Sequence, residues 1–242
     1  MVQPGAVEKG VVIMKLESMN DFFTARVGGY DAHMLTNVEG CKEGYIKMAE
    51  LVEGYYLASG EYGSPLLDLG CGTGLELEEI FKHLPDISIT GVDLTQTMLD
   101  RLREKIPDKA IRLICGSYFD VDLGTGTYGC TVSFQTMHHF SHERKRDLYR
   151  RIYHALKPGG IYVECDYMVE DQAEEDVHFA ENLRLRSEQK IAEDAFFHYD
   201  TPCTIENQIA MLEGAGFCSV EMMFRVENTT ILVAKKKENW NG

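Results

Sequence analysis

The sequence has little of the positive charge that contact with nucleic acid requires. Lysine and arginine together number 24 against 39 aspartates and glutamates, which leaves a net charge of -15 and a pI near 4.9. Such a surface repels a phosphate backbone, so we expect no broad nucleic-acid binding. The basic stretch from Arg144 to Arg151 is more typical of a solvated helix face than of a binding patch.

Cysteine motifs and long apolar runs are also missing. The chain has 7 cysteines, an odd number, and no two of them stand in Cys-x-x-Cys spacing. We therefore expect reduced thiols in a cytoplasmic protein and neither disulfides nor a zinc site. No apolar stretch approaches the roughly 18 residues that span a membrane, and Val11–Met14 is too short for a signal peptide. We expect no membrane contact and a monomer or homodimer.

The chain alternates strand signals with helix signals. Apolar residues at helical spacing separate short buried runs, and this alternation predicts an α/β fold with a mostly parallel, doubly wound sheet and helices on both faces. The segments 218–225 and 229–236, joined at Glu227-Asn228, predict an antiparallel edge hairpin, which makes seven strands. The other five strands are expected at 66–69, 87–92, 111–115, 128–134 and 161–165.

The domain organisation follows from this alternation. Residues 1–62 are expected to form an N-terminal helical arm or cap, of which residues 1–16 are loose. Residues 63–236 form the main domain, and residues 237–242 form a frayed tail. An acidic, helical segment at about 170–200 interrupts the alternation and is interpreted as a lid, with Phe179, Leu183 and Arg186 on one side.

The segment Leu66–Gly74 is the motif with the most specific chemistry. Its glycines lack a Cβ and let a ligand approach the backbone, and the next helix offers free N–H groups. Asp93 ends the second strand, where a carboxylate can accept both hydroxyls of a ribose. Asp68 would repel a diphosphate but attract an ammonium group. The motif therefore favours S-adenosyl-L-methionine (SAM) over a nicotinamide dinucleotide or a purely structural glycine turn.

Four segments together resemble the ordered landmarks of class I SAM-dependent methyltransferases over roughly residues 25–236. These segments are Leu66–Gly74, Gly91–Leu94, Cys115–Phe119 and Val132–Gln135. The resemblance implies a Rossmann-like fold and an enzyme that transfers a methyl group from SAM and releases S-adenosyl-L-homocysteine. The helix from Thr204 that ends near Gly216 also resembles, more distantly, carboxy-SAM synthases of tRNA wobble-uridine modification. If this second resemblance holds, Arg184 or Arg186 would bind the carboxylate of a carboxylated cofactor.

The resemblance implies a role for each landmark at the cofactor. Asp93 would bind the ribose, Leu94 and Met98 would flank the adenine, and the backbone near Phe134 would hold the methionine amine. Many relatives have aspartate where Ser117 stands, so stacking by its neighbours would replace that contact. Tyr30 would close over the methionine half or pack within its helix. The expected set is Tyr30, Asp68, Gly70, Cys71, Gly72, Gly74, Asp93, Leu94, Met98, Ser117, Tyr118, Phe119 and Phe134.

The acceptor side is less defined by the sequence. Methyl transfer needs chiefly proximity and alignment, and a base only if the acceptor must lose a proton. Candidate catalytic residues follow strands four and five, at the crevice of such a sheet: His138, His139 and Asp166. The two histidines alternatively only pack and form hydrogen bonds. Expected acceptor contacts are Tyr167, His198 and Tyr199, with Asp200 beside them.

The expected function is transfer of a methyl group to a small-molecule acceptor. We expect no metal, because His33, His138, His139 and His142 show no recognised ligand spacing. The alternatives are a carboxy-SAM synthase-like enzyme and a non-catalytic SAM-binding protein. The sequence leaves open the acceptor and whether oxygen, nitrogen, sulfur or carbon is methylated.

Overall fold

Two helices precede the sheet: α1 (Met19–Thr36) and α2 (Cys41–Ser59). The computed structural model describes residues 14–192 and 194–238. The expected loose arm lies mostly outside these residues, but Leu16 is buried and its N–H donates to Gln189 Oε1 at 3.0 Å. The end of the expected frayed tail, residues 239–242, is also outside them. Within the described ranges, no helix combines the length and the apolar character of a membrane span.

An eight-stranded sheet forms the centre of the fold. Five strands run parallel, β8 is antiparallel to β5, and β7 is antiparallel to β8, so the predicted mixed sheet with an edge hairpin is confirmed. The short β6 (Cys203–Thr204) pairs parallel with β5 off the main path, so the sheet has eight strands and not the seven expected from the sequence. The order across the sheet is β3 (Ile111–Cys115), β2 (Ile89–Asp93), β1 (Leu66–Leu69), β4 (Tyr128–Phe134), β5 (Leu156–Val169), β8 (Thr229–Lys235) and β7 (Ser219–Val226).

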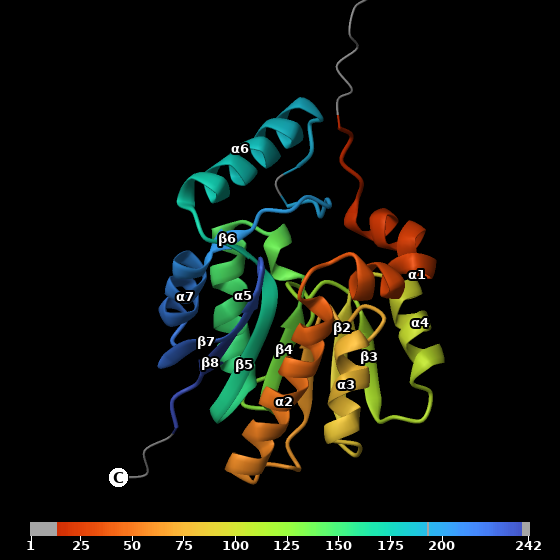
Figure 1. The fold of residues 1–242 in the computed structure, drawn as a ribbon, viewed down its shortest axis with the longest axis vertical. Coiled ribbons are helices and arrows are strands. Elements are labelled where there is room, and N and C mark those ends of the chain that lie inside the picture. The colour runs from red at the N-terminus through yellow and green to blue at the C-terminus, as the bar shows by residue number, and fades with distance from the viewer. Residues whose placement is uncertain (1–13, 193, 239–242) are drawn as a thin grey trace, which may run out of the picture.

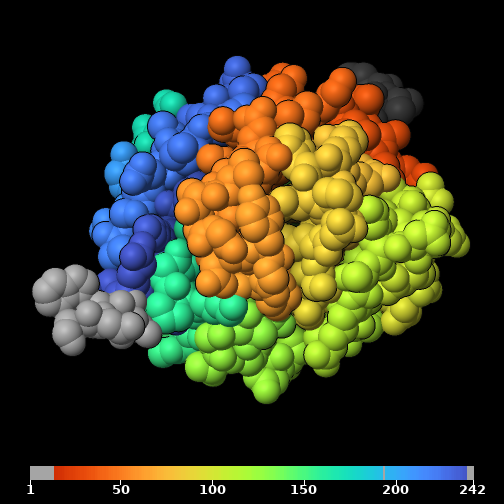
Figure 2. All heavy atoms as spheres, turned by 90° about the horizontal axis from the view of Figure 1, so that it is seen from below, coloured from red at the N-terminus to blue at the C-terminus, as the bar shows by residue number. Residues whose placement is uncertain are grey.

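Helices cover both faces of the sheet, as the continuous apolar strands require. Leu66 packs in the cluster on one face and Leu67 in the cluster on the other, because successive side chains point to opposite faces. Figure 2 views the molecule from the end away from α6 and shows α2 (orange) beside α3 (yellow). The remaining helices are α3 (Leu75–His83), α4 (Gln96–Lys105), α5 (His142–Ala155), α6 (Gln172–Glu188), α7 (Ile205–Gly214) and the 3-10 turn η1 (Met137–His139).

One local prediction is wrong. Strand β5 continues to Val169, so Asp166 and Tyr167 lie within it. Its residues from Ile161 to Tyr167 pair with β8, and Met168 and Val169 pair with β6. Leu183, on the same side of α6 as Phe179, is 69% exposed. Helix α6 stands above the sheet instead of packing along it (Figure 1), which leaves much of its surface in solvent.

Helix α1 and the chain that follows α6 lie above the same end of the sheet (Figure 1). The Met19 N–H donates to the Phe196 carbonyl at 3.0 Å, and the His198 N–H donates to the Glu17 carbonyl at 3.0 Å. The Thr201 N–H donates to the His138 carbonyl at 2.6 Å. These bonds fasten residues 196–201 to the start of α1 on one side and to η1 on the other.

Candidate functional site

A pocket lies at the carboxyl ends of β1, β2 and β4, where the chain order across the sheet reverses. We call it the inner pocket. An open α/β sheet forms its binding crevice at such a position. Its described lining comprises Met19, Phe23, Tyr30, Gly70, Gly72, Asp93, Leu94, Thr95, Met98, Gly116, Ser117, Tyr118, Phe119, Phe134, Gln135, Thr136, His139, Phe140 and Phe196.

The glycine loop after β1 forms one wall of the inner pocket. Gly70 has a φ of 78°, and a Cβ there would lie 2.7 Å from Thr136 Oγ1. Gly74 also has a φ of 78°, and its Cβ would lie 2.9 Å from Leu102 Cγ. Both positions therefore need glycine for backbone conformation and for space. The loop brings main-chain atoms, instead of side chains, to the pocket.

Asp93 is held at the end of β2 by the main chain on either side of it. Its Oδ2 accepts from the Gly72 N–H at 2.9 Å and its Oδ1 from the Thr95 N–H at 2.8 Å. Burial raises the pKa of Asp93 to about 6, although these two N–H groups oppose the rise. Each carboxylate oxygen has a second lone pair, so the group can accept from two neighbouring hydroxyls as well.

A pair of buried carboxyl groups lies behind the glycine loop. Asp68 is 0% exposed and Glu76 is 5% exposed. Asp68 and Glu76 lie within hydrogen-bonding reach of each other, and no other described residue donates to either oxygen of Asp68. Burial raises the pKa of Asp68 well above its ordinary value, and burial raises the pKa of Glu76 to about 7. Buried acids are costly, and an ammonium group nearby would offset that cost.

The structure brings most of the residues expected at the cofactor to the inner pocket. Asp68, Cys71 and Gly74 are not among its lining. Asp68 is fully buried, Cys71 Sγ packs against Gly91, and Gly74 packs against Leu102. Those that line the pocket are Tyr30, Gly70, Gly72, Asp93, Leu94, Met98, Ser117, Tyr118, Phe119 and Phe134.

Sequence reasoning missed part of the pocket wall. Thr95 and Gly116 adjoin recognised landmarks and were within reach of that reasoning. Met19 and Phe196 come from α1 and from the segment after α6, and no local pattern marks them. The other missed residues are Phe23, Gln135, Thr136 and Phe140.

A second cavity of about 1030 Å³ adjoins the inner pocket beneath α1 and the chain after α6. We call it the outer cavity. Four residues line both spaces: Phe23, Tyr30, Gln135 and His139. The remaining described lining is Phe22, Ala25, Arg26, Gly28, Gly29, His33, Met34, Asn37, Val38, Glu39, His138, Tyr167, His198, Asp200, Glu227, Asn228 and Thr229.

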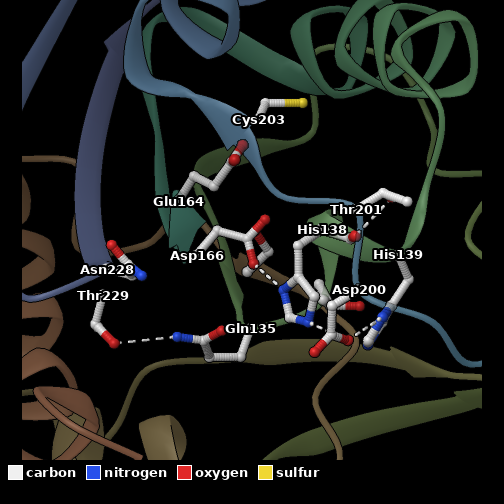
Figure 3. A network of polar contacts seen from close by, with 12 residues as sticks. Gln135, His138, His139, Glu164, Asp166, Asp200, Thr201, Cys203, Asn228 and Thr229 are labelled. Carbon is white, nitrogen blue, oxygen red and sulfur yellow. Dashed lines mark hydrogen bonds and ion pairs between the residues drawn. The ribbon is translucent and has the colours of Figure 1, made fainter. Parts of the chain in front are cut away.

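A cluster of histidines and carboxylates lies at the wall of the outer cavity. His138 Nδ1 lies 2.6 Å from Asp166 Oδ1, and its Nε2 lies 3.5 Å from Asp200 Oδ1. His139 Nδ1 lies 3.3 Å from the same Asp200 oxygen, and His198 Nε2 lies 3.9 Å from it. Figure 3 shows His138 and His139 pointing toward Asp200 from η1, with Asp166 on the far side of His138.

The charges within this cluster are unevenly distributed. Burial alone would lower the pKa of His138, but the carboxylates of Asp166 and Asp200 raise it to about 10. Burial lowers the pKa of His139, and the positive charge of His138 adds to the effect. Burial also lowers the pKa of His198, to about 4. At neutral pH, two of the three imidazoles are therefore uncharged.

The residues expected at the acceptor are placed as follows. His138, His139, Tyr167 and His198 line the outer cavity, whereas Asp166 lies behind His138. Tyr199 is not among the lining, although its carbonyl lies 3.4 Å from His139 Nδ1.

The two arginines expected for a carboxylated cofactor both lie on α6. Arg184 pairs with Glu181 and Glu188 at 2.6 Å each. Arg186 donates to the carbonyls of Ala192 and Ala195. Neither arginine is among the residues that line the two spaces.

Comparison with known proteins supports one family. The methyltransferase domain family matches residues 66–160, which hold the glycine loop and Asp93. The matches support a class I SAM-dependent methyltransferase. A carboxy-SAM synthase from Chromohalobacter salexigens is 29% identical over 189 residues, covering 72% of this chain and 69% of that protein. A second, from Nautilia profundicola, is 25% identical over 181 residues, covering 71% of this chain and 76% of that protein.

Solved methyltransferase structures share the fold. A candidate O-methyltransferase from Nostoc punctiforme has a TM-score of 0.66 at 22% identity, covering 94% of this chain and 64% of that one. A Haemonchus contortus phosphoethanolamine N-methyltransferase, solved with SAM, has a TM-score of 0.54 at 16% identity and covers 72% of this chain and 49% of that one. The chain therefore spans about two thirds of the Nostoc protein and about half of the Haemonchus protein.

The inner pocket suits SAM, the cofactor of this family. The buried carboxyls of Asp68 and Glu76 provide negative charge near the glycine loop for an ammonium group. Asp93 has free lone pairs for the ribose hydroxyls, and Leu94 and Met98 give apolar walls. When bound, SAM supplies an electrophilic methyl group on a sulfonium centre.

Proposed function

We propose that the protein methylates a small organic molecule that binds in the outer cavity. The observation that supports this proposal is the shared wall of the two spaces at Phe23, Tyr30, Gln135 and His139. Displacement at a methyl group needs donor and acceptor in line on either side of it. Two adjoining cavities with a common wall are suited to that alignment. A volume of about 1030 Å³ is large enough for an organic acceptor.

We propose that His139 contacts the acceptor at the junction. Burial raises the pKa of Tyr30 far above neutrality, so its hydroxyl stays protonated and can only orient a ligand. Phe23 and Gln135 carry no group that titrates. His139 is therefore the shared residue that can interact with an acceptor through a nitrogen lone pair. His138, which is paired with Asp166, would fix the position of Asp200 beside the His139 ring.

Methyl transfer is favoured over carboxymethyl chemistry by the lining of the inner pocket. The described residues that line it include neither lysine nor arginine, while Asp93 contributes a carboxylate. A carboxylate on the sulfonium group would lack a cationic partner there. The alternative function is synthesis of carboxy-SAM, because two similar proteins are carboxy-SAM synthases.

We further propose that the segment at about 170–200 acts as a lid on the domain of residues 63–236. Residues 196–201 from its end close over both spaces. We propose a cytoplasmic location for a monomer or homodimer. Its support is that all seven cysteines are free thiols.

The experiment has two parts. Native mass spectrometry of the purified protein should show bound SAM or its demethylated product, and a carboxylated derivative would instead establish the alternative. A panel of small phenols, amines and thiols should then give S-adenosylhomocysteine with at least one member. Asp93→Ala serves as the control and should lose that activity through weak cofactor binding. If SAM binds but a broad panel yields no product, the non-catalytic function replaces this proposal.

A further inference from the structure

The Asp200 carboxylate has an unusual environment at the wall of the outer cavity. Its Oδ1 is buried, and its nearest described neighbours are histidine rings. Nitrogens of His139, His138 and His198 lie 3.3, 3.5 and 3.9 Å from this oxygen. Four ligand-type atoms therefore converge on one small space. A carboxylate oxygen has two lone pairs, so three ring nitrogens around it exceed what hydrogen bonding to that oxygen requires.

The other ring nitrogen of His138 is hydrogen-bonded to Asp166. His138 Nδ1 lies 2.6 Å from Asp166 Oδ1, a distance at which its N–H donates to the carboxylate. Without a metal, a proton on Nε2 lets His138 face the Asp200 oxygen at 3.5 Å. A metal ion that displaces this proton would bind the Nε2 lone pair and the Asp200 oxygen together. A metal-bound histidine characteristically donates its other N–H to a carboxylate in this way.

We propose that His138, His139 and Asp200 bind a divalent transition-metal ion whose open coordination positions face the outer cavity. The ligand atoms of these three residues lie within 4.8 Å of one another. Ligands about 2.0–2.1 Å from a tetrahedral ion lie roughly 3.3–3.4 Å apart. The separations of 3.3 and 3.5 Å from Asp200 to the two histidines approach that value. Two imidazoles and one carboxylate suit zinc, iron or cobalt better than magnesium or calcium.

A second cluster of possible metal ligands already has a positively charged side chain beside it. His142, Glu175 and Cys203 also lie close enough together to hold an ion. There, however, Lys145 Nζ lies 3.1 Å from Cys203 Sγ, and His142 Nε2 lies 2.9 Å from Glu175 Oε1. A lysine ammonium already supplies the positive charge at that place. The cluster around Asp200 is the better candidate because its ligand atoms face a cavity.

The inference deepens the proposed function and rests on it. His139 lines both spaces, so an ion on its ring would lie near the junction where the acceptor binds. The acceptor would then be a molecule that offers an oxygen or nitrogen donor to the ion. The sequence predicted no metal because the spacing of four histidines along the chain matches no known ligand pattern. That prediction did not consider Asp200 as a ligand. The tertiary structure brings Asp200 to them.

The test is a titration of the full-length protein with cobalt(II) chloride after chelator treatment and dialysis. We expect one ion per chain and visible absorption bands of tetrahedral or five-coordinate cobalt. His139→Ala and Asp200→Asn should each weaken cobalt binding at least tenfold. Asp166→Asn should weaken it roughly 10- to 100-fold, as expected for the carboxylate behind a histidine ligand. His33→Ala is the matched control, because His33 lines the same cavity outside the cluster and should leave cobalt affinity unchanged.

Several outcomes separate this inference from the proposed function. Circular dichroism first confirms that each variant is folded, and calorimetry measures SAM binding without metal. If SAM binds but cobalt binds wild type no better than His139→Ala, the metal proposal is overturned and the methyltransferase proposal stands. In that case a protonated His138 satisfies both carboxylates. If cobalt binds with these variant effects but SAM does not bind, the ion site stands and the proposed function fails.

Discussion

Glu76→Gln is expected to stabilise the protein without SAM and to weaken SAM binding. Burial raises the pKa of Glu76 to about 7, against an ordinary value of 4.5. At about 1.36 kcal/mol per pKa unit, ionising the folded protein costs about 3 kcal/mol once the pH exceeds 7. The glutamine amide removes this charge and can donate to the neighbouring Asp68 carboxyl group. For a chain of this size, 3 kcal/mol corresponds to roughly 6–12 °C in Tm.

The sign of the pH dependence is part of the prediction. Because the folded pKa of Glu76 is raised, the cost is absent below about pH 4.5, grows as the pH rises to about 7, and is constant above it. Thermal unfolding without SAM should therefore show a gain for Glu76→Gln at pH 8 and little gain at pH 4.5. Calorimetry should show SAM affinity reduced roughly 5- to 150-fold, the equivalent of about 1–3 kcal/mol for a lost charged partner.

A matched variant controls for a general effect of removing charge. Glu79→Gln lies on the same helix, where Glu79 pairs with Lys82 at 2.6 Å, and it should change neither quantity appreciably. The reasoning is refuted if Glu76→Gln is no more stable than wild type at pH 8. It is also refuted if the variant binds SAM as tightly as wild type does.

Three further predictions concern the glycine loop, the ribose site and the core. Asp93→Ala should raise the Kd for SAM roughly 5- to 150-fold by calorimetry, and an unchanged Kd would show that the ribose lies elsewhere. Gly74→Ala should lower the free energy of unfolding by about 1–3 kcal/mol in urea, because its φ is 78° and the new Cβ meets Leu102. An unshifted midpoint would mean that the loop relaxes freely. Leu232→Ala should cost about 2–5 kcal/mol in the same assay, since Leu232 is 0% exposed, and a smaller loss would argue against tight packing around β8.

The sheet and the cofactor side were predictable because their signals are local. Apolar runs bounded by turn residues placed β1, β3 and β4 correctly, and Ser141 marked the start of α5. The length of β5 was not predictable in the same way. Its residues up to Tyr167 pair with β8, and Met168 and Val169 pair with β6. Both partners are distant in the sequence, so the extended conformation depends on neighbours that no local pattern reveals.

The sequence by itself determined the glycine loop and the carboxylate at the end of β2, because each needs only its own backbone conformation and its place after a strand. Only the tertiary structure decided the surroundings of the acceptor. His139 follows β4, Asp166 lies within β5, and Asp200 follows α6. These groups meet because the chain after α6 returns across the end of the sheet and is fastened to η1 by Thr201. Such convergence depends on packing between distant segments and leaves no fixed spacing along the chain.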